Sequence, residues 1–134
     1  MWLQNKIDPY RPVIYYNNMT NYTDGSLPYI LRFLGDAGVV PRAKVSVLQV
    51  ETPLIVSAEG AVLSLLNWRE SVVTGLDVSV RVKFPVGRVT AVRAMHPENA
   101  ELQFTSMQAP GGEFFTNFTV AELEHSDFVM LHKK

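Results

Sequence analysis

The sequence predicts a mostly β protein: an antiparallel β-sandwich of about eight strands, Ig-like or Greek-key in its connections, with one short N-terminal helix. Three observations predict this class. Short stretches rich in valine, leucine and phenylalanine recur at near-regular spacing after residue 43, which is typical of a sandwich. Turn-forming pairs such as Thr52-Pro53 and Gly111-Gly112 separate them. Within residues 76–83 (LDVSVRVK), apolar and polar side chains alternate, as in a strand with one buried face.

Residues 60–68 (GAVLSLLNW) and 76–83 are the strongest strand predictions. The first stretch is apolar on both faces, which suits a strand in the interior of a sheet, between other layers. In the second, Val78, Val80 and Val82 face one side, and polar side chains face the other. Together they predict a sheet with one face in water and the other packed.

The N-terminal region, residues 1–43, is predicted to be irregular apart from a short helix near 27–36. Prolines and turn residues dominate its first half and disfavour both helix and central strand. Ser26 can cap the helix, apolar residues follow at helical spacing, and Gly35 or Gly38 ends it. We expect this aromatic, proline-rich region to lie across one sheet face or to pair with another subunit.

The sandwich itself is predicted over residues 44–134. Glycine, proline and other turn residues divide this region into short segments. The predicted strands are 44–50, 54–57, 62–67, 77–83, 88–95, 100–107, 113–120 and 127–131. The predicted turns are Thr52-Pro53, Glu59-Gly60, Thr74-Gly75, 85–87, 96–99 and 109–112.

The composition fits one globular domain and limits the partners. The chain has 134 residues, of which 47% are hydrophobic and 19% charged. The formal net charge is -1 and basic residues are scattered, so no nucleic-acid partner is expected.

No apolar run is long enough to span a bilayer, and residues 1–6 lack the apolar core of a signal peptide. A cytoplasmic protein and part of a longer secreted bacterial protein both fit. The absence of cysteine excludes disulfides.

No catalytic, metal or cofactor site is predicted. The acidic residues lie mostly in turns or on polar strand faces, whereas glycoside hydrolysis needs two carboxyl groups on opposite sides of one bond. The histidines do not share metal-ligand spacing, and no serine lies in a Gly-x-Ser-x-Gly elbow. A metal site built from His125, Asp127 and a third ligand is the weaker alternative. We therefore expect a protein that is not an enzyme and has no cofactor.

Aromatic residues give the best ligand-binding candidates: Trp68, Tyr15 and Tyr16. Exposed aromatic rings bind sugars by stacking, so these residues are consistent with a carbohydrate-binding module. In the alternative interpretation the rings cover the sheet or pack on another domain, with Trp68 packed at the rim of the sandwich.

Four stretches carry a resemblance to a known family: residues 31–39, 50–68 (VETPLIVSAEGAVLSLLNW), 76–95 (LDVSVRVKFPVGRVTAVRAM) and 114–134 (FFTNFTVAELEHSDFVMLHKK). Their order resembles the C-terminal β-sandwich accessory domain of bacterial glycoside-hydrolase-like proteins. The resemblance implies a non-catalytic domain that stabilises or orients an upstream catalytic domain, or supports a homo-oligomer. In that family the catalytic acid and nucleophile lie in the upstream barrel, so no catalytic residue carries over. A stand-alone carbohydrate-binding module and a structural assembly protein are the alternatives.

Overall fold

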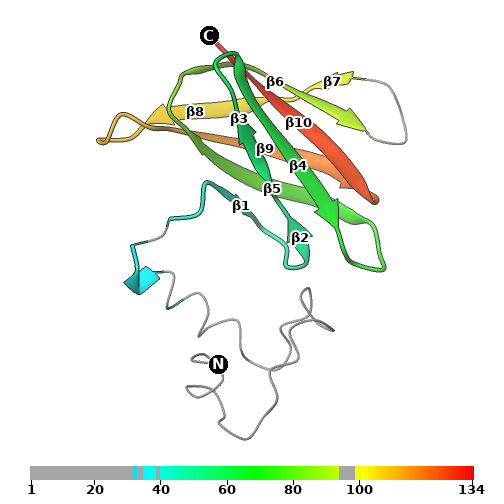
Figure 1. Ribbon diagram of the computed structural model, residues 1–134. Helices are drawn as coiled ribbons and strands as arrows, with labels where there is room; N and C mark the ends of the chain where they lie inside the picture. The colour runs from blue at the N-terminus through cyan, green and yellow to red at the C-terminus, as the bar shows by residue number, and fades with distance from the viewer. Residues whose placement is uncertain (1–31, 33–34, 39, 94–98) are drawn as a thin grey trace, which may run out of the picture. The chain divides into compact units, whose positions relative to one another are not determined.

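The computed structural model describes residues 32, 35–38, 40–93 and 99–134. All strands of these residues belong to one compact unit, Arg42–Lys134. They form two antiparallel sheets (Figure 1), which confirms the predicted mostly β sandwich. The structure assigns ten strands in the described residues instead of about eight, because two predicted strands are each divided in two.

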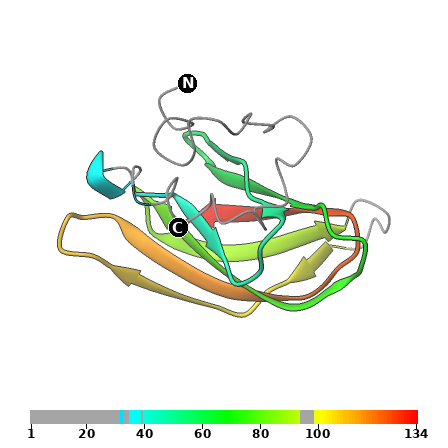
Figure 2. The ribbon, with the colours of Figure 1, turned by 90° about the horizontal axis from the view of Figure 1, so that it is seen from below.

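One sheet has four strands and the other has six. The four-stranded sheet has the order β1 (Ala43–Val45), β5 (Val73–Val82), β9 (Phe114–Leu123), β8 (Phe104–Gln108). The six-stranded sheet has the order β2 (Val50–Glu51), β4 (Gly60–Asn67), β10 (Ser126–Lys133), β6 (Val86–Arg93), β7 (Asn99–Glu101), and β3 (Leu54–Val56) also pairs with β4. The layers lie face to face (Figure 2).

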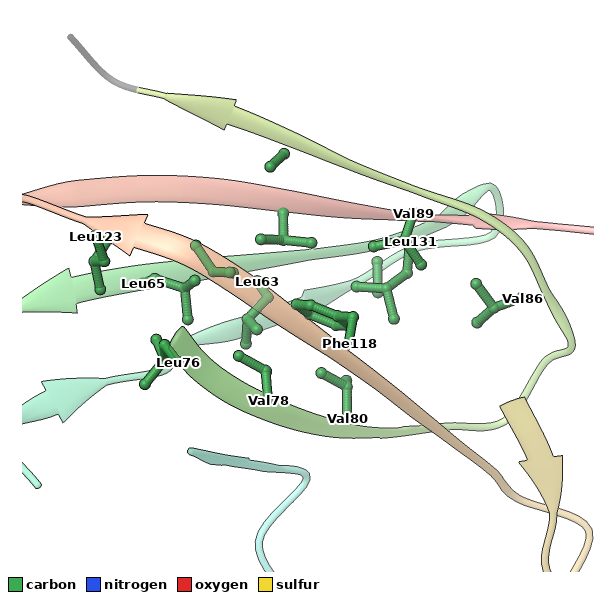
Figure 3. Close-up of a cluster of buried hydrophobic side chains, with 14 of the residues drawn as sticks. Leu63, Leu65, Leu76, Val78, Val80, Val86, Val89, Phe118, Leu123 and Leu131 are labelled. Carbon is green, nitrogen blue, oxygen red and sulfur yellow. The ribbon is translucent and has the colours of Figure 1, made fainter. Parts of the chain in front are cut away.

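The hydrophobic core lies between the two sheets (Figure 3). Val78 and Val80 of β5 enter it from the four-stranded sheet, and Leu63 and Leu65 of β4 enter it from the six-stranded sheet. Phe118 of β9 is also buried there, 4% exposed. Burial of a valine or leucine side chain is favourable by about 1.5–3 kcal/mol, so these inward rows stabilise the contact between the layers.

The two strongest strand predictions are confirmed as strands, but β4 and β5 lie in different sheets and not in the single sheet that the sequence predicted. In β5, Val78, Val80 and Val82 are buried, while the polar residues between them face outward. β4 lies inside its sheet, with β2 and β3 on one side and β10 on the other. The predicted position between other layers is met on one face only: Leu63 and Leu65 face the other sheet, whereas Val62 and Leu66 lie partly buried on the outer face.

The predicted strand 44–50 is wrong as a single element. β1 ends at Val45, and β2 begins at Val50 in the other sheet. The link between them is hydrogen bonded to both sheets: Ser46 N donates to the Asp77 carbonyl at 3.0 Å, and Trp68 N donates to the Gln49 carbonyl at 3.0 Å. Gln49 has a positive φ of 66°, which turns the chain between the two layers.

The predicted strand 100–107 is also divided. β7 ends at Glu101 in the six-stranded sheet, and β8 begins at Phe104 in the four-stranded sheet. Leu102 N donates to the Val89 carbonyl at 2.9 Å, so the crossing starts while the chain is still bonded to β6. Leu102 and Phe104 continue the alternation of apolar and polar residues through the crossing. The sequence pattern therefore does not show where the strand is divided.

Other boundaries differ by a few residues. Thr74-Gly75 is not a turn, because both residues lie within β5. β6 begins at Val86, inside the turn predicted at 85–87. The turn at 109–112 is confirmed, with Ala109 N donating to the Glu113 carbonyl at 2.7 Å. The turn predicted at 96–99 lies almost wholly outside the described residues.

Most of the helix predicted near 27–36 also lies outside the described residues. Arg32, Gly35 and Asp36 are helical, and the exposed side chains of Arg32 and Asp36 approach to 3.9 Å between Nε and Oδ2. Gly38 has a φ of 69° and donates its N–H to the Gly35 carbonyl at 2.9 Å, as at a helix C-terminus. In the described part of the chain, no helix has the length and apolar character to cross a membrane.

Candidate functional site

Of the three predicted ligand-binding aromatics, the structure describes only Trp68. It lies just after the end of β4 and is 54% exposed. Its backbone N–H is bonded to the Gln49 carbonyl, which anchors the residue beside the link between β1 and β2. Tyr15 and Tyr16 lie outside the described residues, so the predicted grouping of the three rings stays a prediction.

A groove of about 1000 Å³ crosses the four-stranded sheet on its outer face. Two outward-facing rows of side chains border it, one on each side of an inward-facing row. We call this feature the polar groove. One row contains Lys44, Ser79, Asn117 and Thr105, and the other contains Ser46, Asp77 and Thr119.

Hydrogen bonds within the protein hold some side chains of the polar groove in place. Thr119 Oγ1 donates to Asp77 Oδ1 at 2.7 Å, across the β5–β9 pair. The backbone N–H of Asp77 donates to Ser46 Oγ at 3.0 Å, across to the segment that follows β1. These contacts join three neighbouring segments and hold the Asp77 carboxylate on the outer face.

An apolar pair continues the outer face beyond the polar groove. Phe115 of β9 is paired with Met107 of β8, and they are 37% and 66% exposed. On its other side Phe115 is paired with Arg81 of β5. Arg81 Nε lies 3.2 Å from Glu113 Oε2 in an ion pair whose side chains are mostly buried. The face thus combines polar groups with an accessible aromatic ring.

The outer face of the six-stranded sheet has a different character. Neighbouring strands place Ile55, Val62 and Met130 in one row, and Phe128 lies beside Val92 in the next. Ile55 is 67% exposed and Phe128 is 42% exposed. We call this surface the apolar face. It consists of Ile55, Val62, Leu66, Val92, Phe128 and Met130, with Ser64 and Thr90 between them.

The acidic residues and histidines do not converge in the described part of the chain. No group of three or more His, Asp or Glu side chains is placed there to hold a metal ion. His125 Nε2 lies 3.6 Å from Glu124 Oε1 on the surface, and His132 Nε2 shares a 2.9 Å hydrogen bond with Thr90 Oγ1. Asp127 is buried, 6% exposed, within β10.

Sequence reasoning missed the polar groove because it treated the outward residues of each strand as separate solvated faces. Alternation in 77–83 and 114–120 is enough to place Ser79 and Asn117 outside. It does not show that they are direct neighbours, because this depends on the register of β5 and β9. A correct strand pairing was therefore the missing information.

Comparison with known proteins relates the fold to carbohydrate-active enzymes. No protein-family model and no curated protein sequence matches the chain. Among solved structures, it is similar to a cycloisomaltooligosaccharide glucanotransferase of Paenibacillus sp., solved in complex with cycloisomaltoheptaose. The TM-score is 0.56 and the identity 15%, over 67% of this chain and 16% of that one.

It is also similar to alpha-L-fucosidase isoenzyme 2 from Paenibacillus thiaminolyticus. The TM-score is 0.54 and the identity 23%, over 84% of this chain and 19% of that one. At these identities the likeness establishes the fold alone. In both cases the chain spans less than a fifth of the length of the enzyme it matches.

Proposed function

We propose that this chain is a non-catalytic accessory domain of a carbohydrate-active enzyme, and that the apolar face packs on the catalytic domain. The apolar face is the observation that carries the proposal. At the centre of the apolar face, the outward residues of β3, β4 and β10 carry no charge, whereas Glu51 and Glu101, in register with Leu66 and Thr90, lie on the border strands β2 and β7. Depletion of charge is characteristic of the buried centre of protein interfaces. Phe128 is an exposed aromatic in this surface, and such residues often dominate binding energy.

The comparisons support a catalytic domain as the partner. The two similar structures described above are chains named as a glucanotransferase and a fucosidase, and this chain covers only 16% and 19% of their lengths. In a longer enzyme, a sandwich of this size is a small part of the polypeptide. The rest of that enzyme is then available as a packing partner. The role that we propose is to stabilise or orient that neighbour.

The proposal is tested by mixing the purified chain with a glycoside-hydrolase catalytic domain encoded in the same reading frame or the adjacent gene. We expect a one-to-one complex by size-exclusion chromatography with light scattering. Phe128→Asp places a charge in the interface and weakens binding by tenfold or more, about 1.4 kcal/mol. The matched control, Thr105→Asp on the opposite sheet, binds as wild type does.

Two results would contradict the proposal. One is the absence of any complex at micromolar concentrations of both partners. The other is a doubled mass for the chain alone that Phe128→Asp reduces to the monomer, which would assign the apolar face to a second copy. Thermal unfolding of both variants verifies that they are folded.

A further inference from the structure

The geometry of the polar groove points to a second role: we propose that it binds a neutral oligosaccharide. The apolar face and the polar groove lie on different sheets, so this inference does not depend on the docking of a catalytic domain. It also differs from the site predicted around Trp68, which lies beyond the end of β4 and is not among the residues that line the groove.

The density of hydrogen-bonding groups is the first argument. Four neighbouring strands place Lys44, Ser79, Asn117 and Thr105 side by side in one row. Neighbouring strands are about 4.8 Å apart, so donors and acceptors recur at a regular spacing across the row and can each bond a different hydroxyl group of an oligosaccharide. The amide of Asn117 both donates and accepts, and the hydroxyls do the same, as recognition of a polyol requires.

Preorganisation is the second argument. The 2.7 Å bond from Thr119 holds the Asp77 carboxylate against the sheet. A carboxylate has about four acceptor sites, so Asp77 can accept from a ligand hydroxyl while keeping its bond to Thr119. A side chain that is already fixed loses less conformational entropy when the ligand binds.

The aromatic ring beside the groove is the third argument. Phe115 precedes Asn117 by two residues on the same face of β9, so the two lie about 7 Å apart along the strand. With the neighbouring Met107, it offers an apolar surface of partly exposed side chains. A ring stacked on Phe115 can continue into a second ring that is hydrogen bonded in the groove.

The charges on this face disfavour other ligand classes. The groove is lined by one cationic side chain, Lys44, and two anionic ones, Asp77 and Glu101. A nucleic acid requires a clear excess of positive charge. Insertion into a membrane surface requires a broad apolar face flanked by cations. A neutral chain of hydroxyl groups fits the observed mixture of amide, hydroxyl and a few charged groups of both signs.

The test measures the affinity of the whole chain for neutral probes, without any catalytic domain. Isothermal titration calorimetry is performed with maltoheptaose, cellohexaose, xylohexaose and dextran. We expect saturable binding of at least one of them. Asn117→Ala and Phe115→Ala each weaken it by about tenfold. Phe128→Ala, an exposed aromatic on the opposite sheet, leaves it unchanged.

Chemical shift mapping locates the site independently of the variants. On titration with the best probe, the Asn117 side-chain amide and the backbone amides of Ser79 and Thr105 are expected to shift most. The inference is overturned if none of the probes binds. It is also overturned if the shifts centre on Trp68, or if Trp68→Ala abolishes binding while Asn117→Ala does not.

Discussion

At the scale of single residues, Asn67 connects parts of the chain that are far apart in sequence. Its Nδ2 lies 2.8 Å from the Glu124 carbonyl and 3.2 Å from the Leu123 carbonyl, at the end of β9. Nδ2 also lies 3.0 Å from the Ser71 carbonyl, and Oδ1 accepts from Arg69 N at 2.9 Å. One side chain therefore joins the β4–β5 connection to the β9–β10 turn.

We expect Asn67→Ala to lower the free energy of unfolding by about 1–3 kcal/mol, because carbonyls at the rim lose their donor. Asn67→Asp is expected to be no better, since a carboxylate cannot donate to carbonyls and repels them. Urea denaturation provides the measurement, with Asn99→Ala in the exposed strand β7 as the control. Equal stability of Asn67→Ala and wild type would contradict this role.

Gly60 is a second residue whose identity follows from its contacts. It opens β4 opposite His132 with a φ of 157°. A β-carbon at this position would collide with the backbone carbonyl oxygen of Leu131, which cannot rotate away as a side chain can. The glycine thus permits close approach of β4 and β10.

For this reason Gly60→Ala is expected to destabilise the protein by about 2 kcal/mol or more. The control is Gly111→Ala, because no atom lies within 4 Å of a β-carbon built at Gly111 and its φ is not positive. The two midpoints of thermal unfolding are compared. An equal decrease of the unfolding midpoint in both variants would show that a collision with β10 is not the cause of the destabilisation.

At the scale of elements, β10 illustrates how one strand serves both faces. It lies between β4 and β6. Val129 and Leu131 point into the core with at most 1% exposed, whereas Phe128 between β4 and β6 points outward and is 42% exposed. Adjacent positions on this strand should therefore differ sharply in their contribution to stability.

Val129→Ala is expected to cost about 2 kcal/mol of unfolding free energy, because two methyl groups leave the core and a cavity remains. Phe128→Ala is expected to cost less than about 1 kcal/mol in the isolated chain. Denaturant titrations of the two variants under identical conditions make the comparison. If Phe128→Ala were the more damaging, the assignment of inner and outer faces in β10 would be wrong.

The sequence was sufficient to predict which side chains of a strand point inward, but it was insufficient to predict where the strands begin and end. The valines of β5 and the alternation in 114–120 predicted which side chains point inward, because a strand has a fixed period of two residues. The crossings at 46–49 and 102–103 were missed, since no glycine or proline marks them. They are set by contacts with Asp77, Trp68 and Val89 in distant strands, which local patterns do not contain.

At the scale of the whole molecule, the two sheets share one core in the described residues. Separation of the sheets would expose this shared core to water. We expect the sandwich to unfold in a single cooperative transition. Loss of strand signal in far-ultraviolet circular dichroism should coincide with the change in tryptophan fluorescence. Separated midpoints would contradict a single folding unit.

The site predicted from the sequence around Trp68 stays a prediction, and the polar groove was not among the predicted sites. Trp68 was identified because it is aromatic, and the structure places it at the rim. The polar groove instead consists of ordinary serine, threonine and asparagine residues that become a surface only when four strands are set in register. Residue type alone does not single out such a site.

Two of the connections between the sheets involve the border strands of the four-stranded layer. β1 continues directly towards β2, and β8 follows directly from β7. Both border strands are short, with three residues in β1 and five in β8, so each presents few unpaired backbone groups to a foreign peptide. Unprotected borders are the usual starting points of fibril growth. We therefore expect the short borders of this layer to disfavour the addition of a strand from another molecule.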